Sequence, residues 1–109
     1  MEDIEKISFK IISAVGSAKS YFIEAMNHAN KSEFKKARES IEKGEELRIE
    51  GHKTHFGLIQ QEAAGKSTEV TLILMHAEDQ LMAAETIKLM AEELIRNYER
   101  IDQLEQKIN

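Results

Sequence analysis

Apolar residues near the start of the chain recur at alternating steps of three and four. Steps of this size return to one face of an α-helix, so the pattern predicts a helix over about residues 3–29. The apolar positions of that face are Ile4, Ile7, Ile11, Val15, Ala18, Phe22, Ala25 and Ala29. A polar stretch over residues 27–32 interrupts the pattern, and we expect Ser32 to act as the N-cap of a second helix.

The second helical pattern covers about residues 32–63 and contains three glycines. Its repeating positions are Phe34, Ala37, Ile41, Gly44, Leu47, Gly51, His55, Leu58 and Ile59. Glycine costs about 1 kcal/mol relative to alanine inside a helix. We therefore expect Gly44, Gly51 and Gly57 to lie where two helices approach closely.

The third predicted helix, over about residues 68–108, carries two apolar rows. We expect Gly65 to end the preceding helix and Ser67 or Thr68 to start this one. The first row contains Ile73, Gln80, Ile87, Leu94, Ile101 and Ile108, with His76, Ala83, Met90, Asn97 and Leu104 three residues further on. The second row contains Leu72, Met75, Asp79, Met82, Thr86 and Leu89. Two rows on one helix indicate that one faces the core of the monomer and the other faces another subunit.

These patterns together predict an all-α fold, an antiparallel three-helix bundle with short turns that assembles into an oligomer. Glutamates recur every seven residues along the third helix, at Glu78, Glu85, Glu92 and Glu99, and predict a solvated face. At about 1.5 Å per residue the third helix is about 60 Å long. Its C-terminal part is therefore expected to project beyond the first two helices or to coil with copies of itself.

Composition narrows the chemistry and the partners. A length of 109 residues suits a single domain, and the absence of cysteine excludes disulfides, thiolate zinc sites and a cysteine nucleophile. Fifteen basic and twenty acidic residues give a net charge of −5, which disfavours binding to nucleic acid or to an anionic membrane. No apolar run is long enough to span a membrane, and the acidic segment 1–5 is unlike a signal peptide. We expect a soluble cytoplasmic protein that is not inserted in a membrane.

His76 has the most unusual setting of the four histidines. It follows four apolar residues and precedes Glu78, Asp79 and Gln80 within about one helical turn. Gln80 lies four residues later on the same face, so its amide could bond one ring nitrogen and leave the other free. The alternative is a histidine at the edge of the core whose polar atoms are satisfied by its neighbours.

Asp79 interrupts an otherwise apolar row. An ionised carboxylate buried there needs a cation, a basic partner or water. If the row lay on a symmetry axis, several copies of Asp79 would meet, and a hard divalent ion such as Mg²⁺ would relieve their repulsion. The alternative is that Asp79 lies at the edge of the row and reaches solvent.

His52 and His55 form a weaker candidate site. Their spacing of three residues allows two imidazoles of one helix to bind a metal ion, but no third ligand is obvious nearby. Such a pair is more often polar helix surface, and His28, in a predicted turn, is also expected to be surface.

Residues 51–63 and 74–82 resemble the IIA component of the lactose/cellobiose-type sugar phosphotransferase system. The family motif H-A-Q-D-H-L-M is matched here by His76-Ala77-Glu78-Asp79-Gln80-Leu81-Met82. The resemblance, which covers nearly the whole chain, implies a homotrimer of nine helices around a threefold axis. It further implies that His76 accepts a phosphoryl group from phospho-HPr and passes it to a cysteine of the IIB component. Asp79 and its two symmetry mates would bind one metal ion per trimer, expected to be Mg²⁺.

The chain departs from the family motif at two positions. Gln80 replaces a second histidine; it can still donate a hydrogen bond to a phosphoryl oxygen, but it carries no charge. Glu78 replaces a glutamine, and we expect it to belong to the glutamate face rather than to the phosphorylation site. In the second helix His55 stands where the family has glutamine. The competing hypothesis is a non-catalytic helical oligomer or regulatory relative that has lost phosphotransfer.

Overall fold

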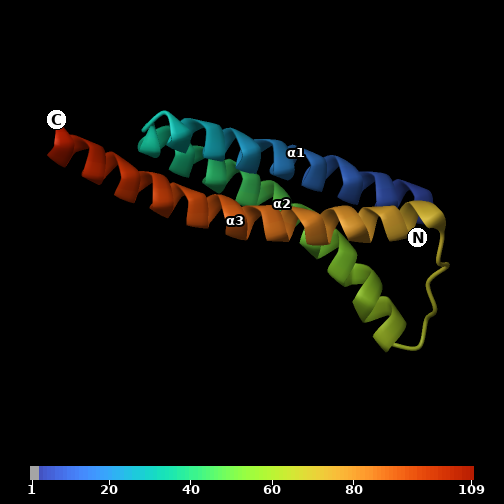
Figure 1. The fold of residues 1–109 in the computed structure, drawn as a ribbon. Coiled ribbons are helices and arrows are strands. Elements are labelled where there is room, and N and C mark those ends of the chain that lie inside the picture. Colours follow the sequence, from blue (N-terminus) through green and yellow to red (C-terminus); the bar gives the residue numbers. More distant parts are fainter. Residues whose placement is uncertain (1–2) are drawn as a thin grey trace.

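The computed structural model describes residues 3–109, which form three α-helices. Helix α1 spans Ile4–Asn30, α2 spans Phe34–Ala63 and α3 spans Leu72–Ile108. The chain runs along the bundle in α1, back in α2 and along it again in α3, so α2 is antiparallel to the other two helices (Figure 1). The predicted all-α three-helix bundle is confirmed.

Helix α1 is the central element of the bundle. It packs along much of both other helices, whereas α2 and α3 contact each other less. The apolar face predicted for α1 is the one that faces the core, with Ile11, Val15 and Phe22 fully buried. The last third of α2 diverges from the other helices, and residues 64–71 bring the chain back to the start of α3 (Figure 1).

The core face of α3 is not either of the two predicted rows. It consists of Leu74, Ala77, Leu81, Ala84, Ala91 and Ile95. The first predicted row lies one position away from this face, and its members Ile73 and Ile87 are half-buried. The expectation that one of the two rows would form the core face was therefore wrong. Alanines form the centre of the true core face because small side chains let α3 approach α1 closely. The second predicted row is exposed in the monomer.

Two of the three α2 glycines lie at close helix approaches. A Cβ on Gly44 would lie 2.5 Å from Cε1 of Phe22, and one on Gly51 would lie 2.7 Å from Cγ1 of Val15. A Cβ on Gly57 would meet nothing within 4 Å, so the same prediction for Gly57 was wrong.

The helix ends differ from the predicted ones at two places. Ser32 does not cap α2: it lies in the turn with φ of 60°, and Glu33 occupies the N-cap position. Helix α3 begins four residues later than predicted, at Leu72, because the Thr71 hydroxyl accepts a hydrogen bond from the Leu74 N–H at 3.2 Å. Gly65 follows α2 with φ of 87°, a left-handed conformation that suits glycine, as predicted.

The C-terminal end of α3 extends past the turn between α1 and α2 (Figure 1). Its apolar residues Ile101, Leu104 and Ile108 are all exposed. The predicted projection of this segment is confirmed.

Candidate functional site

His76 lies in the second turn of α3, on the surface of the molecule. Within residues 3–109 its ring makes no hydrogen bond or ion pair, so both ring nitrogens are open to a partner. The alternative, a histidine at the edge of the core whose polar atoms are satisfied by its neighbours, does not agree with this position. The residue that follows it, Ala77, is fully buried and packs with Ile11 and Val15 of α1.

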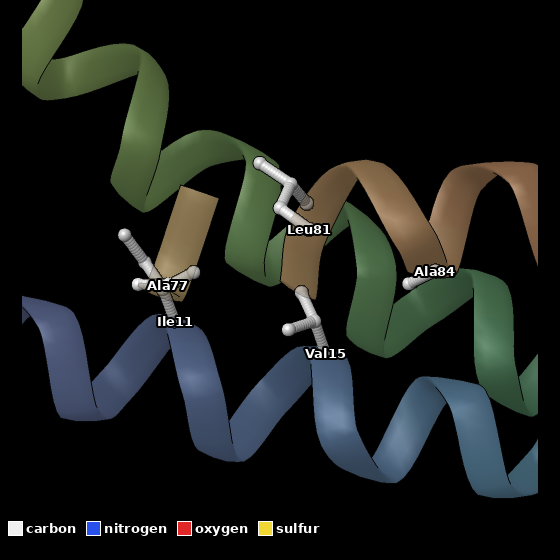
Figure 2. Close-up of a cluster of buried hydrophobic side chains, with 5 residues drawn as sticks. All are labelled: Ile11, Val15, Ala77, Leu81 and Ala84. Atoms are coloured by element: carbon white, nitrogen blue, oxygen red, sulfur yellow. The ribbon is translucent and has the colours of Figure 1, made fainter. Parts of the chain in front are cut away.

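The backbone behind His76 is held by the core. Figure 2 shows Ala77 of α3 beside Ile11 of α1, and Leu81 beside Val15 one turn further along. Leu81 is 2 % exposed, and the other three residues are fully buried. An exposed imidazole thus projects from a helix whose neighbouring face is packed against α1.

Gln80 forms a hydrogen bond with a side chain of α1 and not with His76. Its Oε1 accepts a hydrogen bond from Nζ of Lys19 at 3.0 Å, a contact between residues 61 positions apart in sequence. The expected bond between Gln80 and the His76 ring is therefore not present. Sequence reasoning missed Lys19, and the one available signal was its position directly after Ala18, at the border of the α1 core face.

Glu78 forms a hydrogen bond with a side chain of α2. Its Oε1 lies 2.8 Å from Nε2 of His55, which is half-buried. Two residues along a helix correspond to a rotation of about 200°, so Glu78 and His76 project on nearly opposite sides of α3. The prediction that Glu78 belongs to the glutamate row and not to the surroundings of His76 agrees with this geometry.

The glutamate row is only partly exposed to solvent: the side chains of Glu78 and Glu85 are 45 % and 42 % exposed, and both have partners on α2. The prediction of a fully solvated face is corrected to this extent. Glu85 pairs with Arg48 of α2 at 3.4 Å, and Glu99 pairs with Arg38. The row therefore lies along the boundary between α2 and α3, where it meets basic side chains of α2. The seven-residue spacing of the glutamates predicts that they share one face of α3. It does not predict which side chains of α2 lie opposite that face.

A half-buried ion-pair network lies in the middle of this boundary. Glu45 accepts hydrogen bonds from Arg48 Nε at 2.8 Å and from Arg48 Nη2 at 2.6 Å, and lies 3.0 Å from Nζ of Lys88. The hydrogen bonds from Arg48 lower the pKa of the Glu45 carboxyl to about 2, and those from Lys88 add to the effect.

His52 and His55 do not converge on a common point. The His52 ring is exposed and stacks on Phe56, with 6.3 Å between ring centroids, whereas His55 is engaged by Glu78. Among residues 3–109 no group of three histidine, cysteine, aspartate or glutamate side chains could hold a metal ion. The metal site considered for His52 and His55 therefore has no support in the monomer.

His28 is more than surface. It lies in the last turn of α1, with Nδ1 2.9 Å from Oε1 of Glu33, and this hydrogen bond lowers the pKa of the Glu33 carboxyl.

Asp79 is exposed beside two exposed methionines. Met75 and Met82 flank it on the second row, and within the described residues its carboxylate has no hydrogen-bond or ion-pair partner. One chain thus supplies one carboxylate at this position, too few for a metal site by itself.

A cleft of about 300 Å³ separates the divergent end of α2 from the start of α3. The lining side chains are largely apolar, with the pair of His55 and Glu78 at one side. None of the described helices is long and apolar enough to cross a membrane.

Comparison with known proteins identifies the family. Residues 6–99 match the family described as "PTS system, Lactose/Cellobiose specific IIA subunit". The chain belongs to this family. The chain is 40 % identical over 100 residues to the lichenan-specific phosphotransferase enzyme IIA component of Bacillus subtilis, which covers 92 % of this chain and 91 % of the relative. It is 34 % identical over 109 residues to the lactose-specific EIIA component of Lacticaseibacillus casei, covering 97 % and 95 %.

A solved structure agrees with this assignment. The crystal structure of the PTS cellobiose-specific enzyme IIA from Bacillus anthracis superposes with a TM-score of 0.90 at 37 % identity, covering 94 % of each chain. In the present IIA component, Asp79 and Gln80 lie three and four residues after His76 and so share its side of α3. Glu78 and His55 face each other across the boundary with α2 instead.

Proposed function

We propose that this IIA component carries a phosphoryl group on His76, taking it from phospho-HPr and passing it to a cysteine of the IIB component. The observation that supports this most is the exposed imidazole of His76, free of partners among the described residues, on a helix held by buried neighbours. Two different proteins must reach the same nitrogen in turn, and an exposed ring on a fixed backbone meets that requirement.

The proposed phosphoryl transfer is a direct exchange between side chains of the donor protein, this chain and IIB. A neutral ring nitrogen of His76 attacks phosphorus as the bond between phosphorus and the donor histidine breaks. The other nitrogen of His76 releases its proton, and the departing donor imidazole takes up one. In the second step a cysteine thiolate of IIB attacks phosphorus, and the His76 imidazole leaves and regains a proton. Because such transition states are loose, positioning and charge stabilisation carry most of the catalysis.

We also propose that three copies assemble with their exposed α3 rows facing one axis. Leu72, Met82 and Leu89 of that row are all more than half exposed in the monomer, an arrangement that soluble proteins normally cover. Three Asp79 carboxylates would then meet and could hold one divalent ion, expected to be Mg²⁺, whose role is to neutralise their repulsion. The proposed phosphoryl transfer does not pass through this ion.

For the transported sugar, we propose a chemical class and not a single compound. The relatives are named for lichenan, lactose and cellobiose, which points to uptake of a β-linked disaccharide or oligosaccharide. A IIA component of this kind works in the cytoplasm between HPr and IIB, so selection of the sugar belongs to its membrane partner.

Reconstituted phosphotransfer tests the function. The protein is incubated with phosphoenolpyruvate, enzyme I and HPr, and then with its IIB component, while acid-labile phosphate is followed on each. Wild type should take up one phosphoryl group per chain and lose it to IIB. His76→Ala should take up none, whereas His52→Ala, which removes another exposed histidine, should behave as wild type. Failure of wild type to take up phosphate would favour a non-catalytic helical oligomer or regulatory relative.

A further inference from the structure

We propose that Lys19, held in place by Gln80, is the cationic group that binds the phosphoryl oxygens on His76. This inference rests on the proposed function and names the side chain of α1 that serves it. The observation behind it is the hydrogen bond of 3.0 Å from Lys19 Nζ to Gln80 Oε1, one helical turn after His76.

The contact brings a charge from α1 to the functional side of α3. Lys19 is half-buried, and the residue before it, Ala18, is fully buried. Gln80 directly precedes Leu81, whose side chain packs beside Val15 (Figure 2). Both partners of the hydrogen bond are thus attached to backbone that the core fixes, so the ammonium group is held near one position.

Hydrogen-bond chemistry decides how the two side chains are turned. An ammonium group only donates, so the amide oxygen of Gln80 must face Lys19 and the amide nitrogen must face elsewhere. Lys19 then retains two further N–H donors, and within residues 3–109 the Gln80 amide nitrogen has no acceptor. Donors of both side chains therefore remain available one turn from His76, where a dianionic group with three acceptor oxygens would be formed.

Among the described residues, Lys19 does not form an ion pair with a carboxylate. The basic side chains on the other side of α3 each meet one: Arg38 meets Glu99, Arg48 meets Glu85, and Lys88 meets Glu45. Lys19 meets a neutral amide, and the part of the chain that the structure describes gives it no ion pair. Its full positive charge is therefore available to an anion, in a chain whose net charge of −5 otherwise repels one.

This arrangement also accounts for the altered motif. Gln80 stands where the family motif carries a second histidine, and a glutamine supplies no charge. A glutamine can, however, position a lysine from α1, and the pair provides a cation and hydrogen-bond donors together.

Loading kinetics test the proposal. Phosphoryl transfer from phospho-HPr is measured in single turnovers for wild type, Lys19→Met, Lys19→Arg and the control Lys35→Met, which removes the same charge from an exposed position of α2. Lys19→Met should load about 10- to 100-fold more slowly, the range expected for loss of one charged donor to a transferring group. Lys19→Arg should recover most of the rate, and Lys35→Met should match wild type. Equal rates for Lys19→Met and Lys35→Met would overturn the proposal.

A second measurement does not depend on HPr. Potassium phosphoramidate phosphorylates accessible histidines directly, and peptide mapping gives the ratio of label on His76 to label on His52 within one molecule. Lys19→Met should lower this ratio severalfold, and Lys19→Arg should restore it. An unchanged ratio would overturn the role of Lys19 even if phospho-HPr loaded the wild type. A lowered ratio in a protein that phospho-HPr cannot load would support the anion site and reject the proposed carrier function. Matching helical circular dichroism and melting curves would exclude misfolding as the cause.

Discussion

Nε2 of His55 lies 2.8 Å from Oε1 of Glu78, and this pair joins the divergent end of α2 to the start of α3. Glu78 adds a negative charge two residues from the proposed phosphoryl acceptor. Because its carboxylate is bonded to α2, that charge is directed away from the side of α3 that carries His76.

Glu78→Gln therefore should leave phosphoryl loading of His76 within about twofold of wild type. The variant loses a partly exposed hydrogen-bonded pair, so its free energy of unfolding should fall by less than about 1 kcal/mol. Loading kinetics and urea unfolding measure the two effects. A large change in the loading rate would show that Glu78 acts at the phosphorylation site.

Stability should depend on pH through Glu45. Its carboxyl has a pKa of about 2 in the folded protein against 4.5 ordinarily, so the folded state favours the ionised form. This contribution is complete above about pH 4.5 and is lost as the pH falls from there towards about 2.

Urea unfolding at pH 6 and pH 3 measures this effect. Wild type should lose more stability over that interval than Glu45→Gln does, by about 1–2 kcal/mol after allowance for solvent screening. A matched control is Glu39→Gln, an exposed carboxylate whose removal should leave the pH dependence unchanged. Equal losses for wild type and Glu45→Gln would contradict the role of this network.

Two glycines of α2 should respond oppositely to alanine. Gly51→Ala places a methyl group 2.7 Å from Val15 and should lower the free energy of unfolding by about 1–3 kcal/mol through overpacking. Gly57→Ala meets no neighbour and should raise it by about 0.5–1 kcal/mol through helix propensity. Thermal or urea unfolding distinguishes them, and stabilisation by both substitutions would show that α1 and α2 are not in close contact at Gly51.

Much of this fold follows from the sequence because large apolar residues mark buried faces. The α1 face around Ile11 and Phe22 was predicted correctly for that reason. The α3 core face was missed because its centre is alanine, whose small side chain gives a weak signal next to the larger residues of the flanking rows. The partners of Gln80 and Glu78 could not be predicted either, since both bonds join positions on different helices and depend on how the helices are rotated.

Asp79 gives a separate prediction about assembly. If three copies place this carboxylate on an axis, Asp79→Leu should abolish bound divalent metal and tighten the trimer by removing repulsion. Metal analysis of the purified protein and sedimentation at decreasing concentration measure both effects, with Glu39→Gln as the control. Unchanged metal content in Asp79→Leu would contradict the proposed metal site.

The exposed row itself can be tested without metal. Met82→Glu adds a charge to the proposed subunit interface and should convert the oligomer to monomers at micromolar concentration, because burying three unpaired carboxylates is unfavourable. Sedimentation velocity measures the result, and wild type that is monomeric throughout would contradict the assembly.

The most direct test of the whole account is where the phosphoryl group resides after incubation with phosphoenolpyruvate, enzyme I and HPr. Peptide mapping at neutral or alkaline pH, which preserves phosphohistidine, should find the label on the peptide that contains His76 and on no other histidine peptide. Label on His28, His52 or His55, or no label on any peptide, would contradict the claim that the exposed imidazole of α3 is the carrier.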